Sequence, residues 1–300
     1  MYRNTAFANN SASALAIDPK DPNHMWGLAG TASYNYEDAL IETFDGFKTS
    51  RIYFNLVERL RERAIEDGVE GYYLNDIMYS TVNSNIIATA YFISRDNGRT
   101  WMESELPIYQ LSPHNEAVCY SIKNEEIMIS YNYAKKWQGT GIKISNVQKC
   151  FYADPIEDFV LWVGEHGNSA VHKIDLKTGT ITSFGLSNGL RFPGDRGLQI
   201  KSILRDPDDP DIIFVGAIDY WAAGVGGGFI SIDGGKTFDV IPVPVGGSTM
   251  KLNPVTKKLW IATAGGNVIF DYQTYKQDKL NGCVDLTIYD KYHGAEGSVE

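Results

Sequence analysis

The sequence predicts an all-β fold, a single β-propeller domain of four-stranded blades over residues 1–300. One phrase of eight residues occurs twice, as SRDNGRTW at 94–101 and as SIDGGKTF at 231–238. A D-P-x-D-P element also occurs twice, at 18–22 and 206–210. The third observation is compositional, because 29 glycines, 12% aromatic residues and only 21% charged residues are typical of strands joined by turns.

The spacing of these motifs gives the length of the repeat. Asp18 precedes Asp45 by 27 positions, and Asp206 precedes Asp233 by the same 27. Asp45 belongs to a degenerate third copy of the phrase, TFDGFKTS, and lies 51 positions before Asp96, which lies 137 before Asp233. The interval of 137 is about three steps of 46, so the repeat is roughly 47 residues, as in a propeller blade of four strands.

Short apolar runs separated by Gly, Asn and Pro fill the interval between the clear copies. The predicted blades are six, at 13–55, 64–105, 116–147, 150–185, 199–243 and 247–290, and a seventh would need a contribution from the chain ends. Residues 283–292, CVDLTIYDKY, are a candidate closing strand that pairs with the N-terminal blade. Residues 56–68 have apolar positions at helical spacing and favour a short helical insertion, although AIEDG within them also aligns with the strand segment AIDPK at 16–20.

Composition limits the partners. The net charge is −10 and the pI is near 5.0, so nucleic acid is an unexpected partner because phosphate binding needs clustered Lys and Arg. No apolar run approaches the length of about 18 residues that a membrane span requires, so we expect a soluble chain without membrane insertion. No signal-peptide pattern opens the chain, and extracellular and virion-associated locations stay open.

The three cysteines carry no metal-binding spacing. Cys119, Cys150 and Cys283 are far apart and form no CxxC pair. We expect buried free thiols, with one long-range disulfide as the alternative. The sequence indicates no cofactor and no metal site.

The repeated phrase resembles the Asp box, the BNR repeat of bacterial sialidases and related propellers. In that family the box is a hairpin between the third and fourth strands of a blade. Local physics agrees, because Asp accepts hydrogen bonds from its own turn, Gly permits a positive φ and the final aromatic residue packs between blades. We therefore assign a structural role to Asp45, Ser94, Asp96, Gly98, Thr100, Trp101, Ser231, Asp233, Gly235, Thr237 and Phe238.

The opposite edge of each blade is where function is expected. The D-P-x-D-P turn joins strands one and two and the box joins strands three and four, so both lie on one face; the loops between strands two and three, and the links between blades, form the other. Candidate binding residues on those loops are Tyr34, Tyr36, Tyr133, Trp137, His166, Arg191, Tyr220 and Trp221. Candidate catalytic carboxylates are Asp219, Asp38, Glu37, Glu165 and Asp195.

Aromatic rings beside carboxylates suit sugars, whose C–H faces pack on rings and whose hydroxyls need polar partners. We therefore expect a carbohydrate-directed propeller that binds a glycan or polysaccharide. Whether it is an enzyme stays open; if it is, paired carboxylates would make it a glycoside hydrolase. The alternative is a non-catalytic interaction or assembly propeller, in a virion or cell-surface complex, with other protein subunits as partners.

The combination of D-P-x-D-P with a box is also similar to two-propeller endoglucanases that act on xyloglucan. Those enzymes carry a catalytic Asp in an R-T-D-x-G-G-type stretch of the first blade, where this chain reads AGTASYNYEDA at 29–39. Sialidases carry an F/Y-R-I-P motif before the first box, whereas this chain has only RFP at 191–193. Both departures count against the activities of those families.

Overall fold

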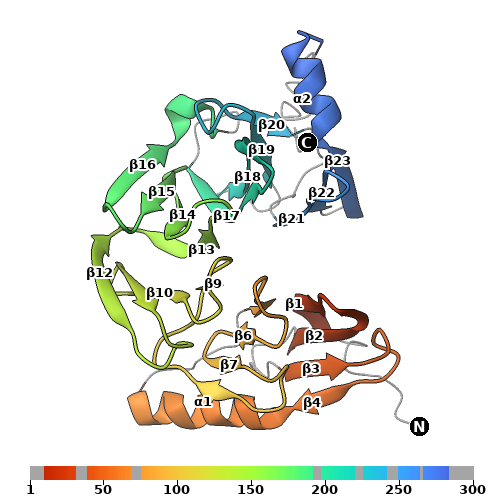
Figure 1. Cartoon of the computed structure of the whole chain (residues 1–300), viewed down its shortest axis with the longest axis vertical. Helices are drawn as coiled ribbons and strands as arrows, with labels where there is room; N and C mark the ends of the chain where they lie inside the picture. The colour runs from red at the N-terminus through yellow and green to blue at the C-terminus, as the bar shows by residue number, and fades with distance from the viewer. Residues whose placement is uncertain are drawn as a thin grey trace, which may run out of the picture. The chain divides into compact units, whose positions relative to one another are not determined.

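The computed structural model describes residues 10–31, 39–68, 76–191, 197–219, 226–241, 249–263 and 266–283. The described chain is all-β, with six antiparallel sheets that follow one another along the sequence as the blades of a β-propeller (Figure 1). The predicted fold class is therefore confirmed. The chain divides into two compact units, Met1–Gly141 and Ile142–Glu300, and the division falls within the last strand of the third blade.

The first unit contains three blades. Blade 1 consists of β1 (Asn10–Asp18), β2 (Asp21–Thr31), β3 (Ala39–Thr43) and β4 (Arg51–Tyr53). Blade 2 consists of β5 (Ile77–Tyr79), β6 (Ile87–Thr89), β7 (Phe92–Ser94) and β8 (Met102–Glu103). Blade 3 consists of β9 (Gln110–Leu111), β10 (Cys119–Lys123), β11 (Glu126–Ser130) and β12 (Gln138–Lys143).

The second unit contains the other three blades. Blade 4 consists of β13 (Val147–Ala153), β14 (Val160–Glu165), β15 (Val171–Asp175) and β16 (Thr180–Phe184). Blade 5 consists of β17 (Leu198–Asp206), β18 (Asp209–Asp219), β19 (Gly226–Ser231) and β20 (Asp239–Ile241). Three strands of blade 6 are described, β21 (Thr249–Asn253), β22 (Lys258–Thr263) and β23 (Gly266–Asp271), and the candidate closing strand at 283–292 lies outside the description except for its first residue.

Apolar side chains from the facing sides of consecutive blades form the core. Trp26 and Leu28 of blade 1 pack with Ile87 of blade 2 in one cluster of buried residues. In the second unit, Trp162 of blade 4 belongs to the same buried cluster as Phe229 of blade 5. Burial of such large side chains contributes about 1.5–3 kcal/mol each, so the contacts between blades supply much of the stability.

Every blade begins with a hairpin that one side chain closes. The side-chain oxygen of the residue that starts the turn accepts the backbone N–H two positions later, at 2.8–3.2 Å. These residues are Asp18, Ser80, Ser112, Asp154, Asp206 and Asn253. The two clear D-P-x-D-P elements are thus members of a sixfold repeat, here termed the D-P turns, which extends to residues with little sequence likeness.

A second hairpin, between strands three and four, closes in the same way. Asp233 accepts from the backbone N–H of Thr237 at 2.9 Å and from its hydroxyl at 2.7 Å, while Ser231 Oγ accepts from Gly235 N at 2.8 Å. Gly234 N also donates to Asp211 O of the D-P turn at 3.0 Å, which places both hairpins at one edge of the blade. Hairpins in which the third residue accepts the backbone N–H four positions later, here termed box hairpins, occupy 43–50, 94–101, 130–137 and 231–238.

The D-P turn side chains also join neighbouring blades. Asp206 of blade 5 is fully buried and accepts from Lys257 Nζ at 2.9 Å and from Tyr272 OH at 2.7 Å, both from the blade 6 segment. Asp154 of blade 4 accepts from Arg205 of blade 5 at 2.5 Å. A buried carboxylate needs such partners to offset its desolvation, so these bonds fix which blade follows which.

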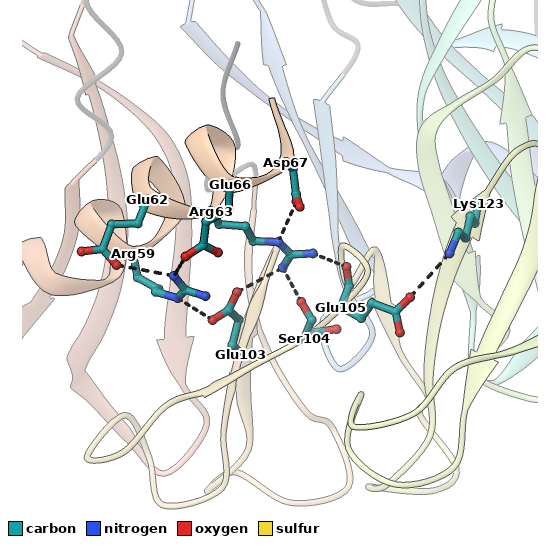
Figure 2. Close-up of polar contacts among 9 residues, drawn as sticks. All are labelled: Arg59, Glu62, Arg63, Glu66, Asp67, Glu103, Ser104, Glu105 and Lys123. Atoms are coloured by element: carbon teal, nitrogen blue, oxygen red, sulfur yellow. Dashed lines mark hydrogen bonds and ion pairs between the residues drawn. The ribbon is translucent and has the colours of Figure 1, made fainter. Parts of the chain in front are cut away.

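Helix α1 (Phe54–Asp67) confirms the predicted helical insertion. Leu56, Val57, Leu60 and Ala64 are buried on one side, whereas Ile65 is 81% exposed, and the helix is capped by Gly68, whose φ is +67°. Figure 2 shows Arg59 and Arg63 reaching from α1 to the end of blade 2, where Arg59 Nε donates to Glu103 at 2.9 Å and Arg63 donates to the Ser104 carbonyl at 2.7 Å. The helix therefore braces blade 2 against blade 1.

The three cysteines are free thiols. Cys119 and Cys150 are buried, as expected, and burial raises the pKa of both thiols to about 12. Cys283 is exposed, contrary to the expectation of a buried thiol. Within the described residues, no helix is long and apolar enough to cross a membrane.

Replacement of Gly98 by Ala should destabilise the first unit severely. Gly98 has a φ of +84°, and an added Cβ would lie 2.0 Å from Trp26 Cζ2. We expect a loss of about 3 kcal/mol or more in the free energy of unfolding, from backbone strain and overpacking together. Gly68→Ala is the matched control, because Gly68 has a φ of +67° and nothing within 4 Å. It should cost only about 1–2 kcal/mol in urea unfolding; equal losses would contradict the packing argument.

Asp206→Asn should weaken the contact between blades 5 and 6. Loss of the buried charge leaves Lys257 and Tyr272 without their carboxylate, at a cost of about 3 kcal/mol in urea unfolding. Asp208→Asn is the control, because that side chain is 70% exposed and its pair with Lys257 should contribute at most about 1 kcal/mol. A loss with Asp208→Asn as large as with Asp206→Asn would contradict the role of burial.

The same carboxylate should make stability depend on pH. Burial tends to raise the pKa of Asp206, but hydrogen bonds from Lys257 and Tyr272 outweigh burial, and the pKa is lowered. A lowered pKa in the folded state means that the stabilisation is complete above about pH 4 and is lost as the pH falls further. Unfolding titrations should therefore show stability declining below pH 4, with a shallower decline in Asp206→Asn; identical slopes would contradict the assignment.

Candidate functional site

The structure describes only some of the predicted functional residues. Tyr34, Tyr36, Glu37, Asp38, Asp195, Tyr220 and Trp221 lie outside the described residues, and Asp219 is described only as the last residue of β18. Glu165, His166, Arg191, Tyr133 and Trp137 are described. The site is therefore built from blade 4 and from the start of blade 5.

Tyr133 and Trp137 do not lie on the kind of loop that the sequence predicted. The segment 131–139 was expected to join strands two and three, but it joins β11 to β12, the third and fourth strands of blade 3. Ser130, Asn132 and Trp137 occupy the positions that Ser94, Asp96 and Trp101 hold in blade 2.

The hydrogen bonds confirm that this segment is a box hairpin. Lys136 N donates to Asn132 Oδ1 at 2.9 Å, and Tyr133 N donates to Ala117 O at 2.9 Å, as in the other box hairpins. The sequence carried this signal, since the serine, the amide or acid and the tryptophan recur at identical spacing. Asn in place of Asp and Ala134 in place of Gly obscured it.

Both aromatic side chains join blade 3 to blade 2. Tyr133 OH donates to Glu116 at 2.7 Å, and this bond raises the pKa of Tyr133. The Arg95 guanidinium lies 3.9 Å from the centroid of the Tyr133 ring. Trp137 Nε1 donates to Ser104 Oγ at 3.0 Å. These contacts explain the aromatic residues of this hairpin by packing.

Glu165 lies at the centre of a polar cluster on three adjacent strands of blade 4. His172 of β15 pairs in register with Ser183 of β16, so both side chains project from the same face of the sheet. His172 Nε2 lies 2.7 Å from Glu165 Oε1, and His172 Nδ1 lies 2.8 Å from Ser183 Oγ. Asn168 Nδ2 donates to the other Glu165 oxygen at 2.8 Å.

The cluster has a defined direction of hydrogen bonding. A carboxylate only accepts, so Nε2 of a neutral His172 carries the proton that faces Glu165. Nδ1 is then an acceptor, and the hydroxyl of Ser183 donates to it. The side chains of His172 and Glu165 are only 12% and 14% exposed, whereas Ser183 is exposed. The cluster therefore presents one ordered, accessible hydroxyl supported by two largely buried groups.

The loop after Glu165 is held to the start of blade 5. Gly167 N donates to Leu198 O at 3.0 Å, and Leu198 N donates to Ser169 Oγ at 2.9 Å. His166 forms an antiparallel bridge with Gln199. Blade 4 and blade 5 are thus joined on the edge opposite the D-P turns as well, and the loop that follows Glu165 and carries Asn168 is fixed.

Arg191 is exposed and is not brought to this cluster by the described contacts. It follows a short 3-10 turn, Leu186–Asn188, that binds the box hairpin of blade 5, where Phe238 N donates to Asn188 O at 2.7 Å. Among the described residues, no group of three or more His, Cys, Asp or Glu side chains is arranged to hold a metal ion.

Part of this cluster was readable from the sequence. Glu165 stood among the predicted carboxylates, and the hairpin segment IDLKTGTIT at 174–182 was visible. If the residues on both sides of the hairpin turn are paired one by one, His172 falls opposite Ser183. This step needs the exact register of the two strands. Neither residue was predicted as functional.

No family model and no curated protein sequence matches the chain. Solved structures match at the level of fold. The chain is similar to the GH74 xyloglucanase from Xanthomonas campestris, with a TM-score of 0.64 and 11% identity over 86% of this chain and 44% of that one. It is also similar to the GH74 enzyme of Niastella koreensis, with a TM-score of 0.58 and 16% identity over 87% and 45%.

A third similar structure is YCF48 bound to D1 peptide, with a TM-score of 0.53 and 13% identity over 87% of this chain and 79% of that one. The chain spans less than half the length of the two GH74 enzymes. These likenesses show the β-propeller fold, which is shared by glycoside hydrolases and by a peptide-bound protein.

The hydrogen-bond order predicts the tautomer of His172. In the wild type, nitrogen chemical shifts measured at about pH 8.5, where an ordinary imidazole is neutral, should report the Nε2–H form. Glu165→Gln replaces an acceptor by an amide that can donate to Nε2, and should shift the population towards Nδ1–H. Asp158→Asn, on the D-P turn of the same blade, should leave the tautomer unchanged. A wild type in the Nδ1–H form would contradict the described order.

Proposed function

We propose that the chain is a carbohydrate-directed propeller, and that Glu165, Asn168, His172 and Ser183 form part of its glycan-binding surface. The observation that carries the proposal is the polar cluster at the edge of blade 4 opposite the D-P turn. Its groups are mutually hydrogen-bonded, with His172 and Glu165 largely buried and Asn168 and Ser183 exposed, and the loop beside them is held to blade 5. Ordered groups bind with less loss of side-chain entropy than mobile ones.

The chemistry of the cluster suits sugar hydroxyls, which donate and accept at once. Ser183 Oγ donates to His172 and keeps lone pairs for a ligand hydroxyl, while Glu165 is an ionic acceptor beside it. The candidate aromatic residues Tyr34, Tyr36, Tyr220 and Trp221, which lie outside the described residues, would supply the apolar contacts. Glycoside hydrolysis stays a proposal that needs a second carboxylate from Asp219, Asp38, Glu37 or Asp195 at a suitable distance from Glu165.

A glycan array tests this proposal with the wild type, Glu165→Gln, His172→Ala and the control Asp158→Asn. We expect the two cluster variants to bind the preferred glycan about 10- to 100-fold more weakly, the range for loss of a charge-assisted hydrogen bond. Asp158→Asn should bind as the wild type does. The proposal fails if the folded wild type binds no glycan, or if both cluster variants bind the glycan as tightly as the wild type does.

Release of reducing ends from any bound polysaccharide then decides between binding and hydrolysis. Activity that disappears in Glu165→Gln would place this carboxylate in the reaction. The alternative is a non-catalytic interaction propeller, which a folded wild type that binds no glycan would favour.

A further inference from the structure

The register of blade 4 places three chemically reactive side chains on one face of the sheet. Strands β14, β15 and β16 are neighbours in this blade (Figure 1). His172 of β15 lies opposite Ser183 of β16 and also opposite Val163 of β14. Glu165 follows Val163 by two positions on the same strand, so its side chain projects from the same face as His172. This face therefore carries a hydroxyl, an imidazole and a carboxylate in that order across the sheet.

The type of strand pairing explains why the hydroxyl meets Nδ1 of the imidazole. Glu165 N donates to Ala170 O at 2.9 Å, across the last pair of β14 and β15. A bond in this place flanks a non-hydrogen-bonded pair, so Val171 and every second residue after it direct their backbone groups to β16. His172 and Ser183 are consequently a non-hydrogen-bonded pair of β15 and β16, in which opposite Cα atoms are only about 4.5 Å apart. The short serine side chain reaches the near ring nitrogen, and the far nitrogen is left for Glu165.

The same pairing sets the direction of the Ser183 backbone. Residues of a non-hydrogen-bonded pair direct their N–H groups away from each other, so the N–H of Ser183 points away from β15. Gly185, two positions later, has the same orientation, and its N–H donates to Asn188 Oδ1 outside the sheet at 3.0 Å. Ser183 therefore supplies a hydroxyl on one face of the strand and a backbone donor on its outer side.

The surroundings of His172 differ from those of a structural imidazole in this chain. His24 lies between Asp18 at 2.9 Å and Glu42 at 3.0 Å and is 4% exposed, so both of its ring nitrogens face carboxylates. His172 faces a carboxylate through Nε2 only, and its Nδ1 accepts from an exposed hydroxyl. A carboxylate behind the imidazole fixes the tautomer and stabilises the imidazolium that forms when Nδ1 takes a proton.

We propose that Ser183 is a nucleophile, that His172 is its general base with Glu165 as the positioning residue, and that the site hydrolyses esters of sugar hydroxyls, such as O-acetyl groups of a polysaccharide. Ser183 Oγ attacks the ester carbonyl carbon while its proton passes to His172 Nδ1, and the Ser183 N–H donates to the oxyanion. The bond from the acyl carbon to the sugar oxygen then breaks. The sugar oxygen takes the proton from Nδ1, and the acyl group stays on Ser183.

Solvent water completes the reaction. It attacks the acyl carbon and gives a proton to His172 Nδ1, and this proton returns to Ser183 Oγ as the carboxylic acid leaves. The usual triad has the serine at Nε2 and the acid at Nδ1, whereas the two nitrogens are exchanged in this site. Proton transfer is equivalent, because either ring nitrogen is basic when the other carries the proton. The sugar part of the substrate rests on the proposed glycan-binding function, and the nucleophile does not.

A fluorophosphonate probe tests the nucleophile without any sugar, because an activated serine displaces its fluoride and keeps the phosphonyl group. Trypsin releases residues 178–191, which contain both Ser183 and Ser187. Both serines are exposed, but Ser187 Oγ contacts an amide oxygen, Asn188 Oδ1, at 3.4 Å. We expect fragment ions to place the adduct on Ser183, and Ser187→Ala to be labelled at the wild-type rate. Ser183→Ala should abolish labelling of this peptide, and His172→Gln should slow it at least about 100-fold.

The positioning role of Glu165 has its own readout. Glu165→Gln should slow labelling in proportion to the shift of His172 to the Nδ1–H form in nitrogen chemical shifts, because that tautomer cannot accept the Ser183 proton. Labelling at the wild-type rate in spite of such a shift would overturn this role. Acetate release from O-acetylated xylan then tests the substrate class, with Ser187→Ala expected to be active and Ser183→Ala inactive.

Three results would overturn the nucleophile. They are no labelling of the folded wild type, labelling of Ser187 as fast as that of Ser183, or labelling of His172→Gln as fast as that of the wild type. Labelling of Ser183 without acetate release would overturn the ester substrate. Because the probe contains no sugar, a labelled Ser183 with no hit on the glycan array would reject the glycan proposal alone, and glycan binding without labelling would reject the nucleophile alone.

Discussion

The architecture depends on the hydrogen bonds that the buried carboxylates of the D-P turns accept, both within their own turn and from the next blade. Asp154 and Asp206 each close their own turn through a backbone N–H and also accept from the next blade. Asp18 does the same for blades 1 and 2, where Asn97 Nδ2 donates to it at 2.9 Å. Because a buried carboxylate is costly without all of its donors, the native arrangement of the blades is the one that satisfies it.

The repeat in the sequence predicted the fold because its key residues act locally. An aspartate that closes its own turn needs only residues within four positions, so its motif survives in the sequence as a short phrase at fixed spacing. The helical insertion was also readable, because Leu56, Leu60 and Ala64 follow the period of a helix and are buried on its inner side.

The box hairpin of blade 3 shows where such reading fails. Ala134 adopts a φ of +59° at the position where the box hairpins of blades 2 and 5 have glycine, and Asn132 replaces the acid while keeping its accepting oxygen. The geometry of the hairpin is preserved although its amino acids differ. Trp137 and Tyr133 were consequently placed on a loop between strands two and three, whereas they lie on the box hairpin and contact Ser104 and Arg95.

The Glu165 cluster needed information that the sequence does not hold directly. Glu165 and Asn168 lie on one loop and were within reach of a pattern argument. The pairing of His172 with Ser183 depends on strand register, and the burial of His172 and Glu165 depends on the neighbouring strands. Long-range contacts of this kind decide the chemistry of a site, and they are the feature that is hardest to predict from a single sequence.

Blade 4 differs from blades 2, 3 and 5 at the turn before its last strand. In blades 2, 3 and 5 the hairpin ends in Trp101, Trp137 or Phe238, and each packs against a core cluster between blades. In blade 4 the turn closes on Asp175, where Thr178 Oγ1 donates at 2.9 Å, and Thr180 follows instead of an aromatic residue. The first four residues of β16 are exposed, and Phe184 at its end is buried. The turn sets the register in which β16 pairs with β15, and this register aligns Ser183 with His172, so the hydrogen bonds of the polar cluster depend on the geometry of the turn.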